Sequence, residues 1–243
     1  MQQNIPQVPP QQDQGRPQHW FRKGAAAAWP ICLGYLPVGL ACGALAQQAG
    51  LPFWAVGLMS ILVFAGSAQF IAISMLAAGA SPVSIILTTL IVNLRHTLMS
   101  STLAIYLQGV NRWFLSLFAY GITDESFAVN MTRFRTGEWD RRQALTVNQL
   151  SNSAWVAATT CGALVGQLIP AGALGMDYAM TGMFISLLTF QLQNLTFILT
   201  GLLAGLISIS CYLLIPGDSY IIIASVSGAS LGYMIKRRGR KNR

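Results

Sequence analysis

The stretch AAAAWPICLGYLPVGLACGALA, residues 25–46, decides the fold class, because it carries no charged side chain and is long enough to cross a bilayer. A membrane-spanning helix needs about 20 predominantly apolar residues. Comparable apolar runs follow, separated by polar or Gly/Pro segments. They predict helices at 25–46, 53–77, 82–107, 113–131, 145–169, 178–192, 195–215 and 220–235. The sixth and eighth are short, so a seven-span or re-entrant arrangement stays open.

The composition points to the same fold class. Of the 243 residues, 53% are hydrophobic and only 9% are charged, whereas about 25% of the residues in soluble domains are charged. A soluble enzyme does not fit this composition. We therefore expect an all-α, polytopic helical membrane protein with about eight transmembrane helices. The spans leave no room for a separate soluble domain, so a single transmembrane domain is predicted at residues 24–235.

Polar tails flank this domain. Residues 1–18 contain seven Gln and four Pro, which is typical of disorder, so residues 1–23 are predicted to form a disordered tail. Residues 236–243 form a basic tail. With an even number of spans, thirteen of the fifteen Lys and Arg residues lie on one side of the membrane, which predicts that both termini are cytoplasmic. These basic segments suit anionic lipids, so the net charge of +8 does not call for nucleic acid.

Ionisable residues inside the apolar runs are the main functional signal. Arg95 and His96 lie in the third predicted span, and Asp124 and Glu125 lie in the fourth. A charge at bilayer depth costs at least about 2.5 to 3.5 kcal/mol, so it needs a partner or a wet cavity. We expect Arg95 to pair with one of the two acids, and which one stays open. Such residues either hold helices together or line a polar pathway, and their number favours the pathway.

Further polar residues surround these charges at helical spacing. Asn93 and His96 share a stripe of the third span, and Asn152 belongs to a stripe of the fifth. His96 either relays a proton or stays neutral as a hydrogen-bond donor. The predicted substrate or ion pathway contains Arg95, His96, Asp124, Glu125, Asn93, Thr123, Ser67, Gln69 and Asn152.

Two segments carry residues that interrupt helices. Pro30 and Pro37 lie inside the first span, close to Gly34 and Gly39. Proline removes a backbone hydrogen bond and clashes with the preceding turn, so we expect this helix to be kinked or broken. Freed backbone groups in broken helices bind substrates or ions in transporters. In the second span, the segment that begins at Gly66 predicts either another interruption or a close helix contact.

No metal, cofactor or catalytic residue is indicated. The four cysteines form no CxxC pair and have no histidines at metal-ligand spacing. A hydrolase with Ser67 or Ser100 as nucleophile and His96 as base lacks a nucleophile motif. A passive channel for small polar solutes and a purely structural subunit of a transport complex remain alternatives to a carrier.

Four motifs occur in order in the first half of the chain. They are GYLPVGLACGALAQQAGL at 34–51, FAGSAQF at 64–70, VNLRHTLMS at 92–100 and ITDESFAV at 122–129, followed by the looser MDYAMTGMFISLL at 176–188. Together they resemble the AzlC family, the large subunit of bacterial branched-chain amino acid exporters. The resemblance is strongest from about residue 25 to residue 131 and looser towards the C-terminus.

The resemblance implies a multi-pass protein of the bacterial cytoplasmic (inner) membrane. It implies export of small hydrophobic amino acids, namely leucine, isoleucine and valine, with methionine as a further candidate, together with a small AzlD-like membrane subunit. The residues are compatible with this substrate class, because a zwitterion needs a partner for each charge. Arg95 and helix-end amides suit the carboxylate, and Asp124 or Glu125 suits the ammonium group.

Overall fold

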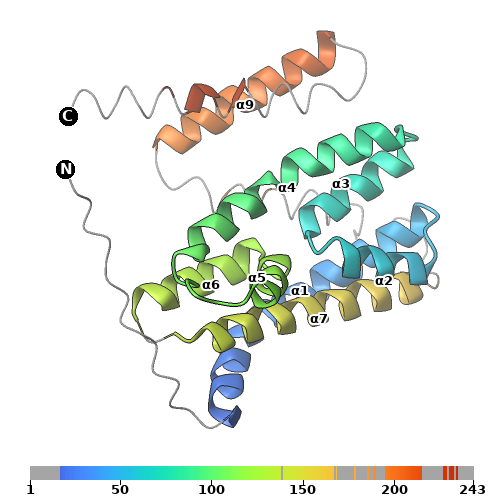
Figure 1. The fold of residues 1–243 in the computed structure, drawn as a ribbon. Helices are drawn as coiled ribbons and strands as arrows, with labels where there is room; N and C mark the ends of the chain where they lie inside the picture. The colour runs from blue at the N-terminus through green and yellow to red at the C-terminus, as the bar shows by residue number, and fades with distance from the viewer. Residues whose placement is uncertain are drawn as a thin grey trace. The chain divides into compact units, whose positions relative to one another are not determined.

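A computed structural model describes residues 17–137, 139–166 and 195–214, together with 168, 178, 185, 189, 227, 228, 230–232 and 234. Over this part of the chain the regular secondary structure is helical, which confirms the all-α prediction (Figure 1). The principal helices are α1 (Pro17–Gln48), α2 (Phe53–Leu62), α3 (Gly66–Ala77), α4 (Pro82–Ala104), α5 (Arg112–Tyr120), α6 (Asp124–Arg135), α7 (Arg141–Gly166) and α9 (Leu195–Leu214).

Three of the described helices are long and apolar enough to cross a membrane. They are Trp20–Gln48 in α1, Pro82–Ala104 in α4 and Phe197–Leu214 in α9. α1 begins at Pro17, so residues 17–23 are helical and the predicted tail boundary at residue 23 is wrong. Residues 1–16, the basic tail and most of the predicted sixth and eighth spans lie outside the described residues.

The chain divides into two compact units. The first contains Met1–Gln69 and Asn93–Ala173, and the second contains Phe70–Val92 and Leu174–Arg243. Within the second unit α9 packs closely on the segment around residue 230, because a Cβ on Gly228 would lie 2.7 Å from the Ala204 Cβ. Every residue of the predicted pathway falls in the first unit.

Helices α1 and α7 form the centre of the first unit and lie side by side (Figure 1). Glycines set their close approach: a Cβ on Gly39 would lie 2.6 Å from the Ala158 Cβ, and a Cβ on Gly43 would collide with the Thr159 carbonyl. Small residues at such positions let helix backbones come close, as in membrane helix pairs. The contacts advance together along both helices, so α1 and α7 run parallel.

Parallel packing bears on the membrane topology. At the N-terminal end of α1, a Cβ on Gly24 would lie 2.6 Å from the Thr146 Cβ. Arg22 and Lys23, beside Gly24, therefore lie at the same end of the unit as Arg141 and Arg142 at the start of α7. The positive-inside rule expects such basic residues on one side of the membrane.

The first span was predicted to be kinked or broken, and the break is absent. α1 continues without interruption from Pro17 to Gln48, with Pro30 and Pro37 inside it. Both prolines are exposed, whereas the face of α1 that packs on α7 carries Gly39 and other buried residues. Proline is tolerated in membrane helices when surrounding structure supports the backbone. Gly34 has open space around it and makes no close approach.

Interruptions occur instead in the second and fourth predicted spans. Residues 63–65 separate α2 from α3, and residues 121–123 separate α5 from α6. An interruption was one of two alternatives for the segment that begins at Gly66; the observed gap lies just before it, and Gly66 itself starts α3. Gly66 also makes the alternative close contact, since its Cβ would lie 3.0 Å from the Trp155 ring. The interruption between α5 and α6 was not predicted.

The two interrupted helices belong to an internal repeat. Gly50 and Gly109 both have positive φ and lie 59 residues apart, and the positive-φ residues Gly79 and Gly137 lie 58 apart. Glycine is the residue that adopts this conformation without steric cost. Each copy therefore consists of a long helix, a glycine turn, an interrupted helix and a second glycine turn, so that α1, α2 and α3 correspond to α4, α5 and α6.

Candidate functional site

The sequence TDES at 123–126 starts α6 in the middle of the fourth predicted span. Thr123 is the N-cap: the Ser126 amide donates to its hydroxyl at 3.3 Å, and the Thr123 amide donates to the Ser126 hydroxyl at 2.9 Å. This reciprocal capping satisfies backbone donors that a helix start leaves free. Asp124 and Glu125 occupy the first turn, where the helix dipole favours negative charge.

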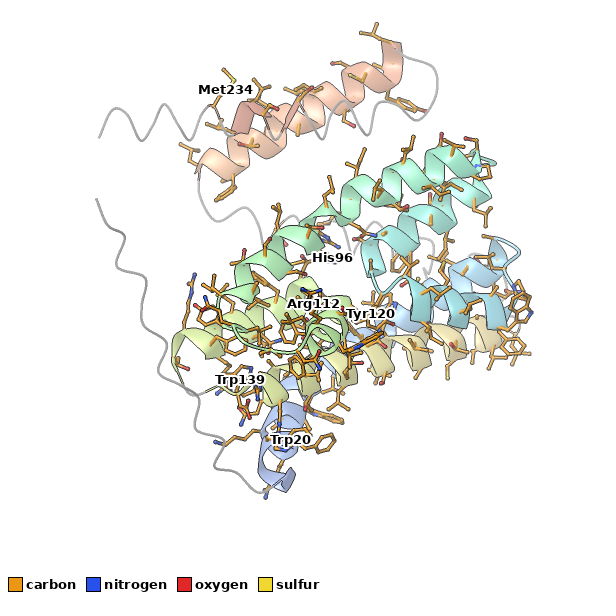
Figure 2. The ribbon with its side chains drawn as sticks, viewed as in Figure 1. Trp20, His96, Arg112, Tyr120, Trp139 and Met234 are labelled. Atoms are coloured by element: carbon orange, nitrogen blue, oxygen red, sulfur yellow. The ribbon has the colours of Figure 1, made fainter. Side chains whose placement is uncertain are left out.

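The C-terminal end of α5 is satisfied by side chains of α7. The Asn148 amide donates to the Phe118 carbonyl at 2.9 Å, and the Gln149 amide donates to the Leu117 carbonyl at 3.2 Å. Asn148 also accepts from the Asn130 amide at 2.9 Å, and Asn130 accepts from the indole of Trp139, which Figure 2 labels, at 3.0 Å. These amides supply partners for carbonyls that have none within the helix.

A second buried chain of hydrogen bonds joins α7 to the interruption between α2 and α3. The Trp155 indole donates to the Gln69 side chain at 2.6 Å, and Gln69 donates to the Ser60 hydroxyl at 2.9 Å. Ser60 lies 2.8 Å from the Thr159 hydroxyl, which returns the chain to α7. Because all four side chains are buried, each bond also avoids the cost of an unpaired polar group.

The two interruptions lie next to each other. Tyr120, at the end of α5 and labelled in Figure 2, donates to the carbonyl of Ile61 near the end of α2. Its ring centroid lies 6.4 Å from that of Phe64, which is inside the first interruption. Arg95 of α4 reaches the start of the helix that follows each interruption, since it donates to Ser67 of α3 and to Asp124 of α6.

The Arg95 to Asp124 ion pair is the electrostatic centre of this region. Arg95 Nη1 lies 2.5 Å from Asp124 Oδ2, and the two side chains are 29% and 37% exposed. The structure thereby confirms that Arg95 has an acidic partner and identifies it as Asp124. A pair taken from water needs good geometry and further hydrogen bonds to offset desolvation, and Ser67 provides one such bond to Arg95.

Glu125 has a different partner, Tyr35 of α1. The Tyr35 hydroxyl lies 2.8 Å from both Glu125 Oε2 and Thr123 Oγ1, and its proton serves one acceptor at a time. The Tyr35 ring packs edge-on against Trp155 at 5.2 Å between centroids. Tyr35, Arg95 and Trp155 are 60 residues apart in succession and occupy α1, α4 and α7, so each long helix directs one central side chain to the interruptions.

The remaining predicted pathway residues are less closely joined. Asn152 donates to the Tyr120 hydroxyl at 3.1 Å, at the edge of the cluster. Asn93 Oδ1 is buried without a partner. Among the described residues, no hydrogen bond joins His96 to Ser67 or Ser100, so the pair that a hydrolase would need is not assembled. Figure 2 labels His96, which is only half-buried.

Several central residues were not singled out from the sequence. Tyr35 had a detectable signal, because a tyrosine in the middle of a span departs from the usual position of aromatic hydroxyls at the membrane interface. Ser151 had a weaker one, as a polar residue in a helix that also carries other polar side chains. Its burial depends on how α7 packs.

The fold and this cluster define a class: a helical membrane protein in which interrupted helices gather ionisable side chains. Comparison with known proteins identifies the family. Residues 30–169 match the AzlC protein family, and the chain therefore belongs to it. This confirms the resemblance recognised from the four sequence motifs.

Relatives cover most of the chain. An uncharacterized membrane protein of Helicobacter pylori is 30% identical over 86% of this chain and 93% of its own length. The branched-chain amino acid transport protein AzlC of Bacillus subtilis is 28% identical over 87% of this chain and 84% of that protein. The inner membrane protein YgaZ of Escherichia coli is 30% identical over 76% and 80%, respectively. No solved structure matches the chain.

Proposed function

We propose that this chain is a secondary transporter that exports branched-chain amino acids across the bacterial cytoplasmic membrane. Leucine, isoleucine and valine are the principal substrates, and methionine is a further candidate. The name of the Bacillus subtilis relative, a branched-chain amino acid transport protein, supports the substrate class. The name of the Escherichia coli relative, an inner membrane protein, supports the location.

The observation that carries this proposal is the bridge that Arg95 makes between two helix starts. A charged pair costs free energy in an apolar protein, so its presence there points to a functional role. Arg95 contacts Ser67 at the start of α3 and Asp124 at the start of α6. Any rearrangement that separates these two helices must break one of the contacts, so the pair links ligand binding to helix movement. Interrupted helices meeting at a polar centre are typical of transporters that work by alternating access.

The charges suit a zwitterion. An amino acid needs donors for its carboxylate and an acceptor for its ammonium group, next to apolar surface for the side chain. Arg95 is the donor, Asp124 and Glu125 are acceptors, and Tyr35, Phe64 and Trp155 supply buried ring surface around them. A substrate bound here would lie beside the Arg95 to Asp124 pair.

Efflux measurements with charge-neutralised variants test the proposal. Cells are loaded with a leucine-containing dipeptide, and release of leucine, valine, methionine and unrelated amino acids is followed with and without the protein. Arg95→Gln and Asp124→Asn should each reduce leucine efflux about tenfold or more, because each breaks the same charge-assisted contact. Both variants should still insert into the membrane. Arg112→Gln is the matched control, since Arg112 is an exposed arginine at the start of α5. Parental efflux from both charge variants would refute the assigned site.

The same measurement separates a carrier from a passive channel. A carrier saturates with substrate and exchanges labelled for unlabelled leucine, whereas a channel does neither. Saturation and exchange are the expected results. We further propose an AzlD-like small membrane subunit as the partner, with anionic lipids at the basic cytoplasmic segments. Expressing each subunit alone and together identifies the transporting component: if the small subunit exports alone, this chain has only a structural role.

A further inference from the structure

We propose that Ser151, the Nε–H of Arg95 and the first-turn backbone amides of α3 and α6 form a binding site for the substrate's carboxylate group. This inference rests on the proposed transport function and assigns one end of the substrate to particular donors. It adds Ser151, a residue outside the predicted pathway, and it replaces the helix-end amides that were expected in the first span.

Ser151 is a buried polar residue without a partner. Its side chain is 0% exposed, and its hydroxyl makes no hydrogen bond. Serines inside helices often bond to the carbonyl one turn back, and Ser153 of the same helix does so with Gln149. A buried hydroxyl that forgoes even this local bond is destabilising. Such a group is explained when something absent from the protein itself supplies its partner.

The position of Ser151 on α7 places it between the two interruptions. Asn148, three residues earlier, packs on Gly121, whose Cβ would lie 2.7 Å from the Asn148 Cβ. Trp155, four residues later, packs on Gly66. Residues at these spacings share one face of a helix. The face of α7 that carries Ser151 therefore touches the interruption between α5 and α6 on one side and the interruption between α2 and α3 on the other.

Free donors converge on the same region. The first N–H groups of a helix have no acceptor within the helix, and two helices, α3 and α6, begin here. In α6 the cap takes the Ser126 amide, so the donors that remain are the amides of Asp124 and Glu125. Their dipoles add positive potential at these ends. Arg95 uses its two terminal nitrogens on Asp124 and Ser67, while its Nε is buried and unpartnered. Of the five guanidinium N–H donors, the one on Nε is thus both buried and without a partner after the ion pair is formed.

These unsatisfied donors suit an anion. Arg95 Nε and the backbone amides can only donate, and the serine hydroxyl can donate as well. Asp124 is already neutralised by Arg95, and Glu125 accepts from Tyr35. A planar carboxylate, with two oxygens that each accept more than one hydrogen bond, matches such a set of donors. Glu125 then remains available for the ammonium end of the same molecule.

Ligand-dependent thermal unfolding of the purified full chain tests the site. The probes are leucine and leucinamide, the latter having the same side chain and ammonium group but no carboxylate. Leucine should raise the unfolding temperature of the parental protein and leucinamide should not. In Ser151→Ala the leucine concentration for half of the effect should rise about tenfold or more, as expected for loss of a hydrogen bond to a charged group. Ser151→Cys, which keeps the volume and weakens the donor, should behave similarly.

Stability without ligand distinguishes a binding role from a structural one. Because the Ser151 hydroxyl has no partner, Ser151→Ala should unfold at the parental temperature or above it. Ser153→Ala, on the exposed face of α7, is the matched control and should respond to leucine as the parental protein does. The site is overturned if Ser151→Ala binds leucine normally, if it is destabilised without ligand, or if leucinamide stabilises the parental protein as well as leucine does.

A failure of the proposed function would look different. If leucine has no effect but another carboxylate, such as acetate, stabilises the parental protein and loses its effect in Ser151→Ala, the anion site stands and the substrate assignment fails. The same holds if leucine binds but reconstituted vesicles do not transport it. If no carboxylate stabilises the parental protein, the site itself is wrong.

Discussion

The two interrupted helices share one arrangement but are held by different interactions. Between α5 and α6, the helix start is capped by Thr123 and the helix end accepts hydrogen bonds from Asn148 and Gln149. Between α2 and α3, the main contacts are the packing of Gly66 on Trp155 and the Gln69 hydrogen bonds. The end of α5 therefore accepts two hydrogen bonds from α7, whereas the end of α2 accepts one, from Tyr120, and the interruption that follows it is held otherwise by side-chain hydrogen bonds and packing.

This difference indicates where movement is easiest. Buried hydrogen bonds to backbone carbonyls are costly to break, so we expect α5 and α6 to keep their geometry during transport. A glycine packed on an indole ring permits small displacements at lower cost. The interruption between α2 and α3 is then the more mobile one. Arg95 joins it to the acidic interruption, the one between α5 and α6 that Asp124 and Glu125 follow.

Removing one buried amide from each interruption should give the largest contrast. Asn148→Leu leaves the Phe118 carbonyl and the Asn130 amide without their present partner and should cost about 3 kcal/mol. Gln69→Leu leaves the Trp155 indole unpaired, while Ser60 keeps Thr159, and should cost about 1 to 2 kcal/mol. Unfolding of the purified variants in detergent measures both. Equal losses would mean that the two interruptions do not differ as described.

Adding a methyl group to each interruption should have a smaller effect. A Cβ on Gly121 would lie 2.7 Å from the Asn148 Cβ. Because the Asn148 Cβ is fixed to the backbone of α7 and moves only with that helix, Gly121→Ala should cost about 2 kcal/mol in stability. On Gly66 the nearest atom is a Trp155 ring carbon at 3.0 Å, so Gly66→Ala should cost about 1 kcal/mol or less. Gly34→Ala, with open space around it, is the control and should be neutral. Greater damage at Gly66 than at Gly121 would reverse the comparison.

Capping should matter more at the acidic interruption. Thr123→Ala removes the N-cap of α6 and should cost about 1 to 2 kcal/mol. Ser67→Ala removes one acceptor of Arg95, which keeps Asp124, and should cost about 0.5 to 1 kcal/mol. Unfolding in the same detergent tests the order. A larger loss for Ser67 would show that the Arg95 bridge, rather than the cap, holds this region together.

Charge pairing was predictable because of a strong physical constraint. An arginine in an apolar helix must find an acidic partner or water, so the sequence indicates a pair involving Arg95. It does not distinguish Asp124 from Glu125, because that choice depends on the helix phase. Residues 121–123 interrupt the helix and reset the phase, so a periodic pattern drawn through 113–131 does not carry across.

The first span shows the opposite limit. Pro30 and Pro37 indicate a kink or a break on local grounds, yet α1 continues through both prolines, which are exposed and lie away from the face that packs on α7. Which face meets a neighbour is a property of the packed fold rather than of the segment. Ser151 was missed for the same reason: only the contacts of Asn148 and Trp155 reveal that it lies between the interruptions.

Tyr35→Phe is the smallest perturbation of this comparison. It deletes the hydroxyl that reaches Glu125 and Thr123 but keeps the ring against Trp155, so we expect a loss of about 1 kcal/mol in stability. Leucine efflux should fall more than stability alone explains if Tyr35 positions Glu125. Tyr106→Phe, whose ring stacks on Phe134, is the matched control and should be silent.

A double-variant cycle tests whether Tyr35 acts through Glu125. Residues that share a hydrogen bond are not additive, so Tyr35→Phe combined with Glu125→Gln should reduce efflux little more than the stronger single change. Additive effects would place the two residues in separate roles and leave Thr123 as the acceptor that matters. In that case Tyr35 would support the capped start of α6, and the acidic interruption would depend on α1 as well as on α7.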